Sequence, residues 1–375
     1  MVTDFFDKTY YEWIAYALLL TGFVLALAIQ FGLYFKLIFL KEPKEAPDEQ
    51  PVSILLIVRN EEERIEKLLI KLLEQEYSEF EIIVVDNFSE DNTLTIVGAL
   101  ARRYPRLKYS ALSQELRFSE KMAVNIALKA ARHDWVIFLS PETGDISPLF
   151  LKKVGNEIRD DHSIALHYLN YAHEKGFFSR WCRIERFYCF LTSAAYSLSG
   201  LLLFFQQNNV VFRKQIYFES AGFKGRMNDD FANMELLFHK KKGKVVVSVD
   251  RETGLREELS PERNELAELV RKRIQIRKNL SWIKRMILGL EDSSVLLLLS
   301  GFVWLLIGET KYWYVYTIPV VIVAGVHLVI VKSLLNRLKE RKIFLSSFIY
   351  LLVRPVISGY SRAALAIHMQ RNRWI

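Results

Sequence analysis

An uncharged run near the start of the chain, Trp13–Phe35, limits the folds that the sequence can adopt. As a helix it would be roughly 35 Å long, which is enough to cross the hydrocarbon core of a bilayer. Aromatic residues lie at both of its ends, as they do at membrane interfaces. The residues before it are acidic and no small-residue cleavage site follows, which disfavours a cleaved signal peptide. We therefore expect a transmembrane anchor within residues 1–40.

Two more apolar stretches lie near the end of the sequence, Ser293–Gly308 and Tyr312–Val331. The short link between them allows a tight transmembrane hairpin. Basic residues follow both the first span and the last one, among them Lys36, Lys41 and Arg337. Because basic residues favour the cytosolic side of a membrane, the pattern predicts an integral protein of the cell inner or plasma membrane. The region between the spans is then cytosolic.

A further uncharged stretch, Phe187–Phe212, leaves two interpretations open. Residues 187–205 alone are long enough to cross a membrane. However, the stretch contains several serine, threonine, glutamine and asparagine residues, and a span here would place the two halves of the middle region on opposite sides. We favour a buried or membrane-dipping helix over a spanning one, since apolar runs are ambiguous by pattern alone.

Charged residues make up 25% of the chain and hydrophobic residues 51%. These proportions fit neither a disordered polar chain nor a bundle of membrane helices alone. The net charge is +8, and the basic residues gather beside the membrane segments, so membrane lipid is an expected partner and nucleic acid is not. Two cysteines are too few for a disulfide scaffold, and the seven histidines lack metal-ligand spacing.

Residues 41–50 form a charged, proline-containing linker, after which apolar runs alternate with helical patterns. The runs expected to be buried strands are Val52–Val58, Glu81–Asp86, Lys108–Leu112 and Trp135–Leu139. The segments with helical periodicity are Glu61–Glu76, Thr93–Tyr104 and Glu120–Arg132. This alternation predicts an α/β domain with a doubly wound sheet that binds ligands at the carboxyl ends of its strands. No G-x-G-x-x-G motif follows the first strand, which disfavours a dinucleotide-binding Rossmann site.

Five motifs in the middle region carry a family resemblance through their order and spacing. They are VSILLIVRNEEERIEKLL (52–69), EIIVVDNFSEDNT (81–93), KMAVNIALKAA (121–131), QNNVVFRKQIYFESAGF (207–223) and Asn228-Asp229-Asp230. Together they resemble membrane-bound family 2 glycosyltransferases, from about Pro51 to Trp282. The resemblance implies a GT-A fold (a Rossmann-like, doubly wound α/β domain) joined to transmembrane helices, and a nucleotide-sugar donor.

The resemblance also implies roles for individual residues. Asp230 matches the base that removes the proton of the acceptor hydroxyl, with Asp229 as its neighbour or alternate. Asn209, Gln275 and Arg277 fall on the acceptor side. The residues that match donor-binding positions are Arg59, Glu61, Asp86, Asp91 and Lys121.

The metal-binding turn departs from the family pattern. Where the family has Asp-x-Asp after the fourth strand, this chain has Ser140-Pro141-Glu142. Glu142 can still hold Mg²⁺ or Mn²⁺, alone or with Asp145, because hard cations take oxygen ligands. The alternative is that the turn binds metal weakly or that the chain has lost turnover.

The Q-x-x-R-W motif departs as well. At its usual place, on the helix before the last spans, the chain keeps Gln275 and Arg277 but has no tryptophan. A literal match, Gln370–Trp374, stands at the end of the sequence, where we expect an interfacial anchor. The family associates this motif with processive synthesis, so its absence at the usual place favours transfer of a single sugar.

The sequence thus predicts an inverting glycosyltransferase that moves one sugar to a lipid-linked or saccharide acceptor at the cytosolic face. The rival is a catalytically impaired relative that binds a glycan or a partner protein. A transporter is disfavoured by the few spans and the large α/β domain. After the anchor and linker, the expected parts are a GT-A domain (51–260), a basic interfacial helix (261–290), a transmembrane hairpin (291–333) and an interfacial or re-entrant segment (334–375).

Overall fold

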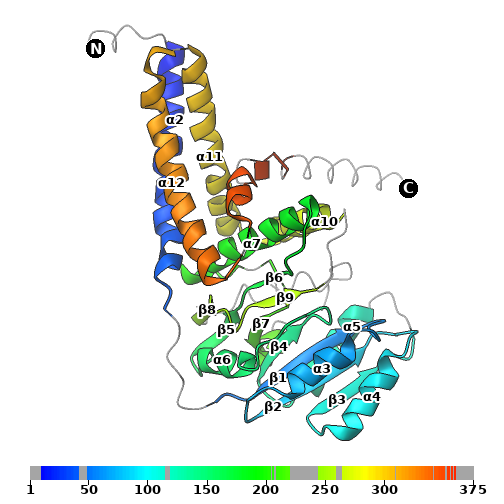
Figure 1. Ribbon diagram of the computed structural model, residues 1–375. Coiled ribbons are helices and arrows are strands. Elements are labelled where there is room, and N and C mark those ends of the chain that lie inside the picture. The colour runs from blue at the N-terminus through cyan, green and yellow to red at the C-terminus, as the bar shows by residue number, and fades with distance from the viewer. Residues whose placement is uncertain are drawn as a thin grey trace, which may run out of the picture.

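The protein consists of a column of long helices standing on an α/β domain (Figure 1). The computed structural model describes residues 10–41, 49–114, 119–203, 205–206, 208–219, 244–258, 264–308, 310–340 and 342–350, and residues 353, 354, 356, 357 and 359 beyond them. Two helices, α7 (Phe177–Leu198) and α10 (Glu265–Asn279), lie between the column and the sheet (Figure 1). They therefore form the junction between the apolar and the polar part of the molecule.

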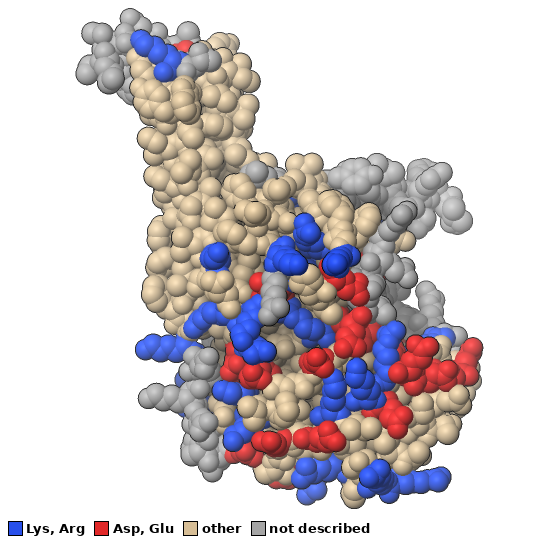
Figure 2. Space-filling view, viewed as in Figure 1, with Lys and Arg blue, Asp and Glu red and all other residues tan. Residues whose placement is uncertain are grey.

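Three helices of the described part are long and apolar enough to cross a membrane. The first is α2 (Tyr10–Ile29), which continues through a π-helical turn (Gln30–Tyr34) and a 3₁₀ turn (Phe35–Phe39). The others are α11 (Trp282–Gly308) and α12 (Trp313–Arg337), joined by a 3₁₀ turn at Thr310–Tyr312. Figure 2 shows an almost uncharged column, with Lys and Arg gathered below its foot. The three spans expected from the sequence are thus present as helices.

The helix α11 begins earlier than the sequence predicts, because charged residues in its first turns have partners inside the protein. Tyr34 and Tyr196 donate hydrogen bonds to the Glu291 carboxylate, at 2.5 and 2.9 Å. Lys284 donates to the Leu202 carbonyl oxygen. A continuous basic helix over 261–290 was expected, but α10 ends at Asn279 and the chain turns into α11 three residues later.

A seven-stranded sheet forms the centre of the domain in the described residues, with strand order β3-β2-β1-β4-β7-β5-β8. The first four strands are parallel, whereas β7 runs antiparallel to both β4 and β5. A small parallel pair, β6 and β9, lies beside it. The strands are β1 (Val52–Val58), β2 (Phe80–Asp86), β3 (Leu107–Ala111), β4 (Trp135–Leu139), β5 (His162–Leu166), β6 (Leu169–Tyr171), β7 (Val210–Arg213), β8 (Lys244–Val247) and β9 (Leu255–Glu257).

The first four strands match the sequence prediction to within one residue at each end. The apolar runs of β1, β2 and β4 are buried on both faces, whereas β3, at the edge of the sheet, is mostly exposed. In β1, Ile54 and Leu56 face one hydrophobic cluster while Leu55 faces the other. The helices that cover this half of the sheet are α3 (Ile65–Leu73), α4 (Thr93–Arg103) and α5 (Ser119–Ala130). Two further helices in the described part of the domain are α6 (Phe150–Glu157) and α8 (Lys214–Glu219). The doubly wound α/β prediction is confirmed.

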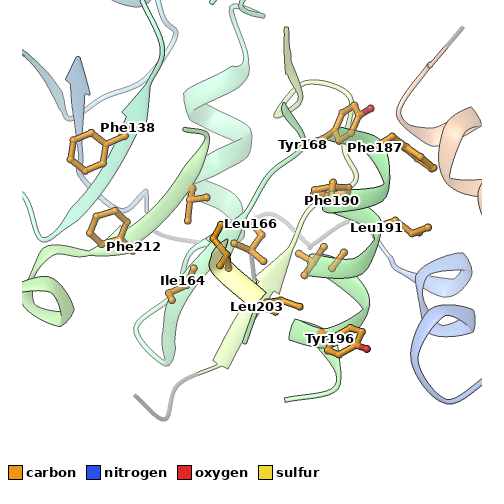
Figure 3. Packing of buried hydrophobic residues seen from close by; sticks show 14 of the residues in the cluster. Phe138, Ile164, Leu166, Tyr168, Phe187, Phe190, Leu191, Tyr196, Leu203 and Phe212 are labelled. Atoms are coloured by element: carbon orange, nitrogen blue, oxygen red, sulfur yellow. The ribbon is translucent and has the colours of Figure 1, made fainter. Parts of the chain in front are cut away.

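The helix α7 carries the first part, residues 187–198, of the uncharged stretch whose location the sequence left open. Most of its residues are buried, and it is not among the helices apolar enough to span a membrane. Phe190 packs edge-on against Tyr168, with ring centroids 5.0 Å apart. Figure 3 shows Phe190 on the side of α7 that faces Leu166 and the sheet, with Leu191 on the opposite side. Protein therefore covers α7 on both sides, and this burial accounts for its apolar side chains.

Candidate active site

Two loops at the carboxyl ends of β1 and β2 are held together by hydrogen bonds. The Asn60 side-chain oxygen accepts from the Glu90 amide at 2.8 Å, and the Asn60 amide donates to Ser89 Oγ at 2.9 Å. The Glu61 amide donates to Thr93 Oγ1 at 2.7 Å. Asn60 adopts a left-handed conformation (φ 56°), which asparagine tolerates better than most residues. These contacts fix the edge of the sheet where open α/β folds bind ligands.

Asp86 and Asp91 organise these loops. The buried Asp86 carboxylate accepts hydrogen bonds from the amide and the hydroxyl of Ser89. Asp91 accepts from the amides of Thr93 and Glu62, at 2.9 and 3.1 Å. Desolvation alone would raise the pKa of Asp91, but the hydrogen bonds from Thr93 and Glu62 outweigh it and lower that pKa below its ordinary value. Both carboxylates thus shape the loops, and whether they also contact a donor stays a prediction.

A cavity of about 280 Å³ opens at this edge of the sheet. Arg59 and Glu61 line it from the loop after β1, as the sequence prediction requires of donor-binding residues. The cavity also has wall residues that the prediction did not include: Asn87, Glu120, Pro141 and Asn208. Lys121 lies next to Glu120 on α5. The carbonyl oxygen of Lys121 accepts a hydrogen bond from the Asn125 side chain.

The Ser140-Pro141-Glu142 turn borders the same cavity. Ser140 Oγ accepts a hydrogen bond from the Glu142 amide at 3.2 Å, so the serine hydroxyl supports the turn. Desolvation, followed by the nearby carboxylates of Glu257 and Glu61, raises the pKa of Glu142 above its ordinary value. Arg186 and Arg64 lower the pKa of Glu142, but they offset this rise only in part.

Glu142 is the carboxylate that the sequence predicts as the cation ligand, and that role stays a prediction. Within the described residues there is no group of three or more His, Cys, Asp and Glu side chains that could hold a metal ion by themselves. Asp145, the second candidate ligand, instead pairs with Lys71 at 2.6 Å. A single carboxylate still fits a divalent cation that is shared with substrate phosphates, which is how Mg²⁺ commonly binds.

Residues 53–231 match the family model described as Glycosyl transferase family 2. The chain carries a family 2 glycosyltransferase domain. Among curated proteins it is similar to the poly-beta-1,6-N-acetyl-D-glucosamine synthase of Staphylococcus epidermidis, with 28% identity over 102 residues. That match covers 27% of this chain and 24% of the relative, so the chain spans about a quarter of the curated relatives it matches.

The similarity to solved structures extends over most of the molecule. The mannosyltransferase PcManGT of Pyrobaculum calidifontis, solved with GDP-Man and Mn²⁺, has a TM-score of 0.54 and 17% identity. It covers 91% of this chain and 99% of its own. TarS of S. aureus (residues 1–349, with UDP-GlcNAc) has a TM-score of 0.47 and 17% identity, over 84% of this chain and 88% of its own. The likeness to the mannosyltransferase confirms the GT-A fold with its long apolar helices.

In the glycosyltransferase domain, Asn208 and Asn209 are adjacent in sequence but lie in different surroundings. The sequence placed Asn209 on the acceptor side. Asn209 is fully buried, and its side-chain nitrogen donates to the carbonyl oxygens of Tyr168 and Thr253, at 2.8 and 2.9 Å. Asn208 instead lines the 280 Å³ cavity and also a second, smaller one. The polar run after Phe205 signals this region, but the pattern alone could not tell which asparagine faces the cavity.

The second cavity of the domain has a volume of about 150 Å³ and lies between α7, α10 and β9. Its wall carries the ion pair of Arg186 and Glu257, with Nη1 and Oε2 2.5 Å apart. Burial opposes the charge of Arg186, but Glu257 outweighs it and raises the pKa of the guanidinium. Sequence reasoning missed both residues. A usable signal for Arg186 was the group of charged residues directly before the uncharged stretch, Arg180, Arg183, Glu185 and Arg186.

The remaining predicted residues lie on α10 or outside the described part. Arg277 pairs with Asp292 at the start of α11, at 2.8 Å, and Gln275 is half-buried near it. The α10 residues that line the second cavity are instead Leu269, Lys272, Arg273 and Ile276. Asp229 and Asp230 lie outside the described residues, as does the literal Q-x-x-R-W at 370–374. Their predicted roles stay predictions.

Proposed function

We propose that this protein is an inverting glycosyltransferase that moves a single sugar from a nucleotide-sugar donor to a lipid-linked or saccharide acceptor. The observation that carries the proposal is the cavity at the carboxyl ends of β1, β2 and β4, inside a matched family 2 domain. Arg59 and Pro141 line it, and the half-buried Glu142 follows Pro141 in the same turn. This is the edge at which open α/β sheets bind nucleotides.

The charges around the cavity favour a donor bound together with a cation. Glu61 and Glu142 both have raised pKa values, chiefly because of desolvation, with neighbouring carboxylates adding to the effect. An anionic diphosphate would be repelled from this edge unless positive charge lay between them. Glu142 would hold Mg²⁺ or Mn²⁺ there, and the cation would neutralise the charge of the leaving diphosphate. Arg59 would supply further positive charge at the cavity wall.

In the proposed reaction the acceptor hydroxyl attacks the anomeric carbon from the face opposite the leaving group, so the configuration inverts. Asp230, with Asp229 as its neighbour, would remove the hydroxyl proton as the glycosidic bond to the diphosphate breaks. The second cavity, which shares Asn208 with the donor cavity, is the proposed acceptor side.

The membrane orientation is also part of the proposal. The basic ends of the first and last spans meet in space, because Arg337 donates to the carbonyl oxygens of Leu37 and Leu40. The basic residues that follow the first span and those that follow the last span therefore both lie at the end of the column that carries the glycosyltransferase domain (Figure 2). By the positive-inside rule we place that domain in the cytosol, at the inner or plasma membrane.

Thermal stabilisation of the detergent-solubilised protein by UDP, GDP and their sugars, with and without Mn²⁺, tests donor binding. A metal-dependent rise in unfolding temperature that is lost in Glu142→Gln supports the proposed donor site. Asp230→Asn should then abolish sugar transfer while it retains nucleotide binding. Unchanged transfer by this variant would refute the assignment of the base.

The second candidate function is a catalytically impaired relative that binds a glycan or a partner protein. Ser140 favours it, because a hydroxyl that supports the turn stands where the family has a carboxylate. If none of the nucleotides stabilises the protein, with or without Mn²⁺, this candidate replaces the enzyme. Sugar transfer by the purified protein would eliminate it.

A further inference from the structure

Three cavities follow one another from the donor site into the helix column. The donor cavity and the 150 Å³ cavity share a wall residue, Asn208. A third cavity, of about 100 Å³, lies within the column between α2, α11 and α12. Glu185 on the wall of the middle cavity is 3.7 Å from Arg354, which lines the column cavity. The ion pair of Glu185 and Arg354 therefore joins the wall of the middle cavity to the wall of the column cavity.

The middle cavity has an excess of positive charge among its described wall residues. Three cations, Arg186, Lys272 and Arg273, face two carboxylates, Glu185 and Glu257. Arg186 pairs with Glu257 and Arg273 pairs with Glu185, each at 2.5 Å, while Lys272 lies at the exposed edge of the wall. Adding Arg354, which also pairs with Glu185, increases the excess further. Such a site suits an anionic group.

The column cavity offers mainly hydrocarbon. Its polar wall residues already have protein partners: Tyr34 donates to Glu291, Tyr188 lies 3.1 Å from the His327 ring nitrogen, and Gln30 donates to the Val323 carbonyl oxygen. Apart from Ser294 and Arg354, the rest of its wall is aliphatic or aromatic, including Ile29, Leu191, Leu298, Val320, Ala324 and Phe348. A cavity with such walls, open among membrane helices, suits an apolar chain rather than a sugar.

We propose that the acceptor is a lipid phosphate, whose chain enters from the column cavity and whose phosphate binds in the middle cavity beside Lys272 and Arg273. The phosphate then lies next to Asn208, at the entrance to the donor cavity. This inference rests on the proposed function, because it names the chemical class of the acceptor. The inference excludes a free saccharide as the acceptor, because a saccharide has no apolar chain to occupy the column cavity.

Binding of dodecyl phosphate to the full chain in dodecyl maltoside tests the inference without any donor present. We expect dodecyl phosphate to raise the unfolding temperature in a concentration-dependent way, more strongly than inorganic phosphate or dodecanol. Lys272→Ala should weaken the apparent affinity about tenfold, because it removes a charge-assisted contact. Arg271→Ala, the exposed neighbour outside the cavity, should leave the affinity unchanged.

The column cavity is tested by a matched pair on α12. Ala324→Phe fills the cavity and should remove the advantage of dodecyl phosphate over inorganic phosphate, whereas Gly325→Phe, on the open side, should not. Nucleotide stabilisation with Mn²⁺ reports whether each variant is folded and whether the donor site works independently. Equal stabilisation by inorganic phosphate would show a free-phosphate site, and equal stabilisation by dodecanol would show that only the chain is bound. Either result, or no stabilisation at all, would overturn the inference.

Discussion

Glu185 on α7 and Arg273 on α10 form an ion pair, with Oε1 and Nε 2.5 Å apart and both side chains buried. Tyr350 donates a hydrogen bond to the same carboxylate. Burial by itself would raise the pKa of Glu185, but Arg273 and Arg354 outweigh it and lower that pKa below its ordinary value. The Glu185 carboxylate thus links α7 to α10 and to the segment after α12.

Removing one partner of this pair should cost much of the stability of the junction. Arg273→Ala leaves Glu185 buried with less compensating charge, which costs about 3–5 kcal/mol. We expect the unfolding temperature in detergent to fall by about 10 °C. Arg271→Ala, exposed on the same helix, serves as the control and should change it little. Equal effects of the two variants would mean that the pair contributes nothing specific.

Two glycines set the distance between α2 and α11. A Cβ at Gly301 would lie 2.4 Å from the backbone nitrogen of Leu19, and a Cβ at Gly22 would lie 2.3 Å from that of Leu298. Because backbone cannot move aside as a side chain can, Gly301→Val should push the helices apart and lower the unfolding temperature by several degrees. Gly289→Ala, on the same helix with open space around it, should be neutral or stabilising. A neutral Gly301→Val would contradict this close packing.

Glu142 should affect stability and ligand binding in opposite directions. Its raised pKa means that the ionised carboxylate costs the apo protein free energy, so Glu142→Gln should slightly raise the unfolding temperature at neutral pH. The same variant should weaken Mn²⁺-dependent nucleotide binding by about tenfold or more. Removing Mn²⁺ with EDTA should reproduce the binding loss in the native protein. Retained metal dependence in Glu142→Gln would exclude Glu142 as the cation ligand.

Glu340 should make stability depend on acid pH. Burial alone would raise its pKa, but Arg256 and Arg183 outweigh that effect and lower it below the ordinary value. A lowered native pKa stabilises the protein above the pKa of the unfolded chain, and that stability is lost as the pH falls through the native value. The deficit of Glu340→Gln should therefore shrink between neutral pH and about pH 3. The exposed Glu76→Gln should show no such convergence in unfolding temperature.

Substitution of Asn209 should affect stability, whereas substitution of Asn208 should affect activity. Asn209→Ala removes two buried hydrogen bonds and places alanine at a φ of 60°, which costs about 3 kcal/mol in total. Asn208→Ala should change stability by no more than about 0.5 kcal/mol but should alter the KM for the donor or the acceptor. Thermal unfolding and transfer assays of the two variants check this division. The opposite pattern would place Asn209, not Asn208, at the cavity.

The fold could be predicted from sequence as far as local patterns reach. Val52–Val58 and Trp135–Leu139 were found to the residue, because a strand buried on both faces needs a continuous apolar run. The strands beyond β4 were not predicted, since β7 and β5 are short and pair antiparallel within a mixed sheet. For the site, the motifs led to Arg59 and Glu61 at the cavity but not to Arg186 and Glu257, which act through a contact between distant segments.

The sequence by itself determined that the chain has apolar helices long enough for a membrane and an α/β domain with polar loops at one edge of its sheet. Spacing encodes these properties, because hydrophobic periodicity and uncharged length depend only on neighbouring residues. The tertiary structure alone decided that Glu142 lies among other carboxylates, that Glu291 can stand in an apolar helix, and that α7 is covered by protein. Those outcomes depend on contacts between distant segments, where burial and charge are set by partners that no local pattern records.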